Sequence, residues 1–264
     1  MFLPRLNSRL SFAFLGLASG VVAVFLGARG VTAQTEPPEV PANGNSERSK
    51  LLPLPETMGG RTGDLLSKTP KSDEKVRELL KKGKTAVSQN QIAAAKTEFV
   101  RVLEQVPDDL TALVNLGWIA QREQLWEQSE SYLRRALKQS VEDPAIWLAI
   151  GLATLEQGKL ESATAAFAQT VVLDPKNARA RRFLGLTLGK RGWLDGAEQE
   201  IRKSLELDPD DAGAHFNLAV FYLQRRPPAL ELARRHYYKA RDLGFASDQE
   251  IESQLAQGAG RPQN

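Results

Sequence analysis

The fold is decided by PAIWLAIGLATLEQGKLESATAAFAQTVVLDPKN, residues Pro144–Asn177. Its apolar side chains recur at helical spacing in two runs, which are Trp147, Ile150, Gly151 and Thr154, then Leu160, Ala163, Phe167 and Thr170. Gly158 separates the runs, where the end of a helix favours a left-handed residue, and Pro175 interrupts the chain after the second run. The stretch therefore predicts two short helices joined by a tight turn.

The same pattern recurs along the chain with a period of 34 residues, in units 76–109, 110–143, 144–177, 178–211 and 212–245. The eighth position holds a small residue in every unit: Gly83, Gly117, Gly151, Gly185 and Ala219. The twentieth position is also small, and a large side chain follows four residues later, once two extra residues are allowed in the fifth unit: Phe99, Leu133, Phe167, Ile201 and Tyr237. We expect the small residues to let two helices approach closely and the large one to fill the gap to the next unit.

One such unit cannot cover its own apolar face, so the units are expected to stack into a linear array. At these residues the chain resembles the tetratricopeptide repeat (TPR) family. The signature positions are Trp147, Gly151, Ala163, Phe167 and Pro175, together with Gly117, Gly185, Ala197 and Pro209 in other units. The resemblance implies an all-α fold, an α-solenoid in which helix-turn-helix units form a right-handed superhelix.

The repeat domain is expected over residues 71–257, ending in a capping helix at 247–257. Ser247 to Glu250 form a capping box, with Ser247 as the cap, and Ile251, Leu255 and Phe245 are placed to face the last repeat. Residues 258–264 are predicted to be a disordered tail.

The chain begins with the features of an export signal in residues 1–33. Two arginines precede an apolar run at Ser11–Gly27, and Val31 and Ala33 offer the small residues that a signal peptidase recognises. An uncleaved membrane anchor at 11–27 is the alternative; in both cases the rest of the chain is expected outside the cytoplasm, in the periplasm or extracellular space. The proline-rich segment 34–70 is predicted to be a disordered linker that acts as a spacer, and the alternative is that its apolar cluster Leu51–Pro55 forms a docking motif.

Composition excludes several classes of function. The formal charge of +3 is too small to argue for nucleic acid, and the absence of cysteine removes thiol chemistry and thiolate metal sites. No phosphate loop or hydrolase motif occurs, so the chain is predicted not to be an enzyme and to need no cofactor or metal. The two histidines, His215 and His236, have no second ligand at helical spacing, which favours a structural or surface role.

The family resemblance implies a concave groove, lined by the first helix of each unit, that holds a partner protein or peptide. Transferring its groove positions to this sequence gives Val114, Trp118, Gln121, Leu148, Leu152, Leu155, Arg179, Arg182, Leu186, Phe216 and Val220. Packing in the core is the alternative role for Trp118, Leu152, Leu155 and Phe216. Trp126 and Trp193 lie next to turns and are predicted to pack, and the arginine doublets 181–182, 225–226 and 234–235 either lie on solvated helix faces or bind an acidic partner.

These features predict an exported, non-catalytic scaffold that binds a partner protein or peptide through its groove. Contact with a membrane is expected only if the N-terminal segment stays uncleaved. The alternative is a membrane-tethered assembly factor, or a spacer, for a secretion or polysaccharide machine of the cell envelope.

Overall fold

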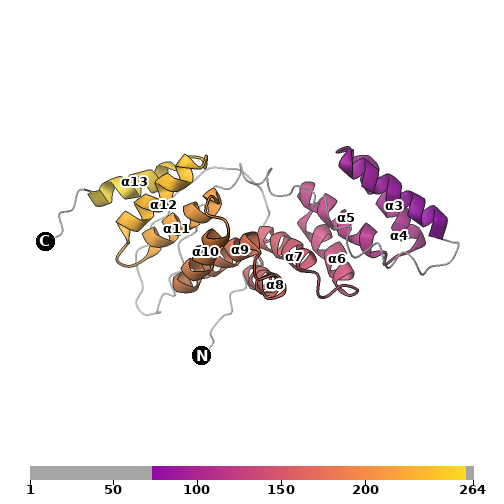
Figure 1. The fold of residues 1–264 in the computed structure, drawn as a ribbon, viewed down its shortest axis with the longest axis horizontal. Helices are drawn as coiled ribbons and strands as arrows, with labels where there is room; N and C mark the ends of the chain where they lie inside the picture. The colour runs from indigo at the N-terminus through magenta and orange to yellow at the C-terminus, as the bar shows by residue number, and fades with distance from the viewer. Residues whose placement is uncertain (1–72, 260–264) are drawn as a thin grey trace, which may run out of the picture. The chain divides into compact units, whose positions relative to one another are not determined.

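The computed structural model describes residues 73–259, and this part of the chain contains eleven α-helices and no strand (Figure 1). Their bounds are α3 Asp73–Ser88, α4 Ile92–Gln105, α5 Leu110–Arg122, α6 Trp126–Leu137, α7 Pro144–Glu156, α8 Leu160–Leu173, α9 Ala178–Lys190, α10 Leu194–Leu207, α11 Ala212–Gln224, α12 Leu230–Asp242 and α13 Gln249–Ala259. The predicted all-α fold is confirmed. The predicted signal segment and linker lie outside the described residues.

Each predicted unit contains one pair of helices. The first helices α5, α7, α9 and α11 begin at Leu110, Pro144, Ala178 and Ala212, which are 34 residues apart and are also the first residues of the predicted units. The first pair departs from this spacing, because α3 begins at Asp73, three residues before the predicted first unit.

A polar side chain caps the beginning of four first helices. Asp109 accepts a hydrogen bond from the backbone N–H of Ala112 at 2.8 Å, and three equivalent caps follow at intervals of 34 residues: Asp143, Asn177 and Asp211. Each cap satisfies a backbone donor that the first turn of a helix leaves unpaired. The periodicity of apolar residues does not indicate these caps, although Asp or Asn recurs in the sequence every 34 residues at this position.

The turn inside each of the first four units uses one residue with positive φ. Gly158 and Gly192 have φ of 73° and 82°, as the sequence predicts, and the equivalent positions of the first two units hold Asn90 at 58° and Gln124 at 59°. The following backbone N–H then bonds back to the helix, as from Lys159 to the carbonyl oxygen of Thr154 at 2.9 Å. The geometry of the turn is therefore common to all four units, even where glycine is missing.

The glycine at the eighth position packs against the large side chain at the twenty-fourth position of its own unit. A Cβ atom placed on Gly151 would lie 2.5 Å from Cε1 of Phe167, and the equivalent distances at Gly83, Gly117 and Gly185 are 2.7 Å. The expectation that the large residue fills the gap to the next unit is therefore incomplete. The Phe167 ring packs on Gly151 of its own unit and also stacks on Phe183 of the next unit, with ring centroids 5.3 Å apart.

Neighbouring units stack through both layers of helices. Each of the second helices α4, α6, α8 and α10 packs on the first helix of its own unit and on that of the next, and first helices also touch directly, α5 with α7 and α9 with α11. The described residues thus form a consecutively packed α-solenoid. The family resemblance implies that the first helices line the concave side of such an array.

The C-terminal helix α13 covers the end of the last unit. Ile251 and Leu255 are buried against it, and the Phe245 ring stacks on Phe216 with centroids 4.3 Å apart. Two details of the prediction are wrong. The N-cap is Asp248, which accepts from the N–H groups of Glu250 and Ile251, instead of Ser247, because the buried Asp248 also donates its own N–H to the Tyr237 hydroxyl. The helix also extends to Ala259, two residues into the predicted tail.

Candidate functional site

The structure divides the predicted groove residues into a buried and a partly exposed set. Six are buried: Val114, Trp118, Gln121, Leu152, Phe216 and Val220. Five are partly exposed: Leu148, Leu155, Arg179, Arg182 and Leu186. The exposed fractions of Trp118 and Leu152 are 6% and 5%, so these side chains pack inside the array, and only the second set offers surface to a partner.

Gln121 shows what the buried set does for the array. Its amide Nε2 donates a 2.7 Å hydrogen bond to the carbonyl oxygen of Ala149, which joins α5 to α7. Trp118 belongs to the core cluster that holds the same two helices together, with Leu113, Ile146 and Ile150. These residues fix the distance between neighbouring first helices.

Three partly exposed leucines lie on α7 and α9. Leu148, Leu155 and Leu186 all pack against the core cluster formed by Leu152, Ala163, Phe167, Phe183 and Leu184. We call Leu148, Leu155 and Leu186 the apolar strip. Apolar side chains that are partly exposed and rest on a rigid core are typical of surfaces that bind a partner.

Two arginines stand beside the apolar strip on α9. The guanidinium carbon of Arg182 lies 4.6 Å from the centroid of the Phe183 ring, and that of Arg179 lies 5.7 Å away. Arg182 is held further by an ion pair with Asp211, with 2.8 Å between Nε and Oδ2. Cation–π contact and the ion pair keep this basic edge in a defined position.

The arginine doublets are largely engaged within the array. Arg181 pairs with Glu200 at 2.9 Å, Arg225 with Asp195 at 2.8 Å, and Arg234 with Glu231 at 2.5 Å. Internal ion pairs therefore account for most of this positive charge.

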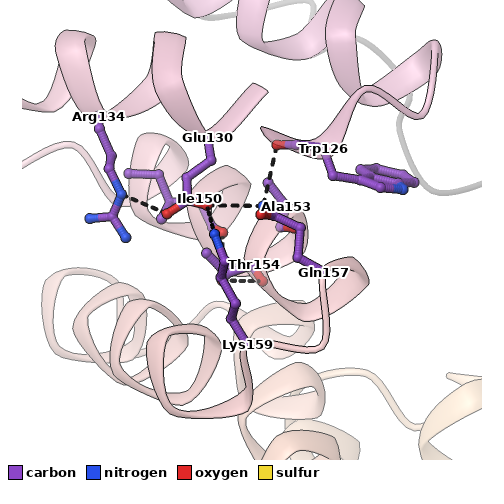
Figure 2. Close-up of polar contacts among 9 residues, drawn as sticks. Trp126, Glu130, Arg134, Ile150, Ala153, Thr154, Gln157 and Lys159 are labelled. Atoms are coloured by element: carbon purple, nitrogen blue, oxygen red, sulfur yellow. Dashed lines mark hydrogen bonds and ion pairs between the residues drawn. The ribbon is translucent and has the colours of Figure 1, made fainter. Parts of the chain in front are cut away.

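A polar network centred on Glu130 holds α7 against α6 (Figure 2). The carboxylate of Glu130 accepts hydrogen bonds from Arg134 at 2.7 Å, Lys159 at 2.9 Å and Gln157 at 2.9 Å. The Gln157 amide also donates to the carbonyl oxygens of Ala153 and Trp126. Burial raises the pKa of Glu130, but the hydrogen bonds from Lys159, Arg134 and Gln157 outweigh burial and lower it to about 2.

A latch at the same place recurs at the other junctions between units. The residue that directly follows the first helix contacts the second helix of the preceding unit: Glu123 contacts Lys96, Gln157 contacts Glu130, Arg191 contacts Glu161 and Arg225 contacts Glu198. The first latch pairs a glutamate with a lysine, the second an amide with a glutamate, and the last two an arginine with a glutamate.

We expect Glu130→Gln to lower the free energy of unfolding at neutral pH by about 1 to 2 kcal/mol, since charge-assisted hydrogen bonds are lost while Arg134 and Lys159 stay half-exposed to water. The folded pKa lies below the unfolded value of 4.5, so the stabilisation exists above pH 4.5 and disappears as the pH falls towards 2. Urea unfolding across this range should show the two proteins converging. Glu142→Gln is the control, because Glu142 is exposed just before α7 and should change the stability little. A constant difference down to pH 2 would contradict the assignment.

Two features escaped the sequence analysis. Trp193 is 57% exposed, contrary to the expectation that it packs, and the Arg191 guanidinium carbon lies 4.3 Å from its ring centroid.

His215 and His236 lie in contact, with their Nδ1 atoms 2.9 Å apart, although they are 21 positions apart in sequence. Burial first, and then His215 and nearby arginines, lower the pKa of His236 to about 4. Only the register between α11 and α12 could have indicated this pair.

The described part of the chain also lacks membrane spans and metal clusters. None of the helices in 73–259 combines the length and the apolar character needed to cross a bilayer. Within the same range, no group of three or more potential ligand side chains is arranged to hold a metal ion.

Known proteins share this architecture. At 18% identity, the structure of MamA superposes with a TM-score of 0.58, over 70% of this chain and 95% of that one. YrrB, described as a TPR protein with an unusual peptide-binding site, gives 0.58 at 21% identity over 72% and 96%. PilF of Pseudomonas aeruginosa gives 0.59 at 20% identity over 71% and 85%. These likenesses establish the fold.

Two curated proteins are similar in sequence. Cellulose synthase operon protein C of Xanthomonas axonopodis pv. citri (strain 306) is 31% identical over 152 residues, which is 54% of this chain and 10% of that protein. The protein CTR9 homolog of Arabidopsis thaliana is 29% identical over 126 residues, which is 45% and 12%. The chain thus spans about a tenth of the length of these relatives.

Family models also match this chain. One model described as tetratricopeptide repeat matches residues 80–145, 119–178 and 148–212, and a second matches 200–241. TPR proteins bind protein or peptide partners and are in general non-catalytic scaffolds. From its helix pairs, its 34-residue spacing and these matches, the chain belongs to the tetratricopeptide repeat family.

Proposed function

We propose that this protein is a non-catalytic scaffold that binds a partner protein or peptide outside the cytoplasm, through the inner face of its first helices. The observation that carries the proposal is the apolar strip beside Arg179 and Arg182. Leu148, Leu155 and Leu186 rest on a closed core and keep part of their surface exposed, next to two arginines held over Phe183.

This combination favours a particular kind of partner segment. Apolar side chains would cover the leucines, and an acidic or carbonyl group would lie at the arginine edge, because guanidinium groups bind carboxylates with well-defined geometry. The core beneath the strip is rigid, so binding requires little ordering of the scaffold itself.

The N-terminal segment supports the proposed location outside the cytoplasm. The basic residues before the apolar run and the small residues at Val31 and Ala33 support export, with cleavage after Ala33. Mass spectrometry of the protein recovered from its own cells should find Gln34 at the N terminus in an envelope or secreted fraction. Recovery in the cytosol with the segment intact would contradict export.

The binding face can be tested without disturbing the core. We expect Leu155→Asp combined with Leu186→Asp to reduce partner capture by about tenfold or more, because a charge placed in an apolar contact must be desolvated. Trp118 and Leu152 are unsuitable targets, since their burial would mix binding with unfolding. The measurement is capture from the cell envelope of the source organism, followed by titration with the partner so identified.

Val172→Asp is the matched control for this experiment. Val172 lies on the second helix α8 and is 71% exposed, so the same change there should leave both capture and the melting temperature as in the wild type. If the strip variant melts normally and still captures the partner, the inner face is not the binding surface.

A second candidate function is that of an assembly factor or spacer for a polysaccharide machine in the envelope. It is favoured by the 31% identity to cellulose synthase operon protein C, which covers 54% of this chain. In that case, deletion of the protein should impair polysaccharide output, and the strip variant should restore output fully. A strip variant that fails to restore it would favour the groove-binding function instead.

A further inference from the structure

One segment of the sequence has the chemistry that the apolar strip and its arginine edge require. Residues 51–56 are LLPLPE, in which three leucines are followed by the carboxylate of Glu56. The segment lies outside the described part of the chain, and it is retained in the mature protein when cleavage follows Ala33. The chain therefore contains a stretch that is complementary to its own inner face.

The prolines of this segment favour an extended backbone. Each proline fixes its own φ and directs the preceding leucine, Leu52 or Leu54, away from the helical region. In the polyproline II conformation the chain rises about 3.1 Å per residue with three residues per turn, so Leu51 and Leu54 lie on one side, about 9 Å apart. Because the prolines already restrict the backbone, binding in this form loses little conformational entropy.

The spacing of the leucines on α7 matches this repeat. Leu148 and Leu155 are seven residues apart in one helix, which places them on the same side at a separation of about 10.5 Å along the axis. Leu186 of α9 packs on the same core cluster beside them. An extended segment that lies along α7 therefore places one leucine at each end of the strip.

The two arginines of α9 mark one end of the strip. They occupy the second and fifth positions of their unit, and Leu148 also occupies the fifth, whereas Leu155 occupies the twelfth. Because the units stack in register, the arginine edge lies towards Leu148. Glu56 comes two residues after Leu54, so its carboxylate reaches the arginines when Leu54 lies at Leu148. The segment then runs antiparallel to α7, and its C-terminal end lies where the first helices begin.

The connection to the array is long enough for this arrangement. Residues 57–72 join Glu56 to Asp73, the first residue of α3, and these 16 residues span about 53 Å when extended. The helices α3 and α9 are three units apart, and packed helices lie about 8 to 10 Å from each other, so the crossing is on the order of 30 Å. The segment can therefore reach the strip of its own chain.

We propose that Leu51–Glu56 bind the apolar strip of their own chain and cover the inner face until a partner displaces them. The inference rests on the proposed binding function of that face. A short connection holds the segment at an effective concentration on the order of 1 mM. A segment with a dissociation constant of about 0.1 mM is then bound about ten times as often as it is free, and the apparent affinity of a partner falls by about the same factor.

The contact can be tested without a partner, because the chain contains no cysteine. A nitroxide spin label attached through Ser49→Cys in the mature protein should broaden the methyl resonances of Leu155 and Leu186. Those of Leu232, which is exposed on α12, should stay sharp. Broadening confined to α3, or broadening transferred to unlabelled, isotope-enriched chains in a mixture, would overturn the proposal.

A matched pair of variants assigns the contact to the segment. Leu51→Ser, Leu52→Ser and Leu54→Ser together should remove the broadening at the strip. Leu65→Ser with Leu66→Ser changes another pair of leucines in the same connection and should leave the broadening as it is. Equal broadening in the triple-serine variant and in the unsubstituted segment would overturn the proposal.

The affinity for a partner reports the regulation. A partner identified by capture should bind the triple-serine variant about tenfold more tightly than the wild type, and the variant at residues 65 and 66 equally to the wild type. Equal affinity in all three proteins would overturn the regulation. If the label shows no contact while Leu155→Asp with Leu186→Asp still reduces capture, self-binding is excluded and the proposed function stands. Contact at the strip with unchanged capture by that aspartate variant supports self-binding and contradicts the proposed function.

Discussion

Gly151→Ala should destabilise the array by about 1 to 3 kcal/mol, although alanine is the better helix former. The added Cβ would lie 2.5 Å from Cε1 and 2.6 Å from Cδ1 of the buried Phe167 ring. That ring is confined by Phe183 on its other side, so it cannot move away without opening the junction to the next unit. Thermal and urea unfolding of the purified protein measure the effect.

Gly196→Ala is the matched control for this substitution. Gly196 also lies within a helix, α10, but a Cβ there meets only Cδ1 of Leu188 at an ordinary 3.7 Å. The same chemical change should therefore stabilise the protein by about 0.5 to 1 kcal/mol. Adding Phe167→Leu to Gly151→Ala should cost less than the sum of the two single changes, because the smaller side chain makes room for the methyl group. Strict additivity would show that the two residues do not share one contact.

Phe167→Ala should cost about 3 to 5 kcal/mol, which is the usual loss when a buried phenylalanine is truncated. The ring contacts Gly151 in its own unit and Phe183 in the next, so its removal weakens a central junction of the array. Since stability in a repeat array is the sum of units and junctions, we expect unfolding to separate into two transitions. Calorimetry, together with hydrogen exchange resolved by helix, distinguishes the two halves.

Tyr237→Ala removes a buried aromatic ring from the equivalent position at the end of the array, and serves as the comparison. It should expose α12 and α13 to exchange while leaving α5 to α8 protected, because the Tyr237 hydroxyl bonds Asp248 and Glu252 in the C-terminal cap. A Phe167→Ala protein that still unfolds in one transition, with uniform loss of protection, would contradict the nearest-neighbour description.

The parts of the fold that depend on local chemistry could be predicted from the sequence. Repeated apolar spacing, glycine at the eighth position and a breaker at the end of a unit are visible in the letters, and they produce helices, turns and close approach wherever they occur. The polar N-caps such as Asp109 and Asn177 also depend on local chemistry and recur every 34 residues, but a pattern based on apolar residues alone does not include them.

The candidate site was predictable only in part. The resemblance assigned eleven residues to a groove by their position in the unit, and position fixes the side of a helix but not how much of it a neighbour covers. Trp118 and Leu152 lie under atoms from other helices, whereas Leu155 and Leu186 keep exposed surface. The exposed fraction of a side chain depends on contacts from several helices, so the residue type at one position does not predict it.

The sequence by itself determined the helix pairs, their period of 34 and the close approach of the two helices at the small residue of a unit, because these follow from interactions within about thirty residues of chain. The tertiary structure alone decided which groove residues stay exposed. It also decided that the Glu130 carboxylate accepts hydrogen bonds from Arg134, Gln157 and Lys159, and that His215 contacts His236. Those outcomes depend on the rotation and register of one helix against the next. A shift of one residue turns a side chain by about 100° around its helix, which is enough to separate any of these partners.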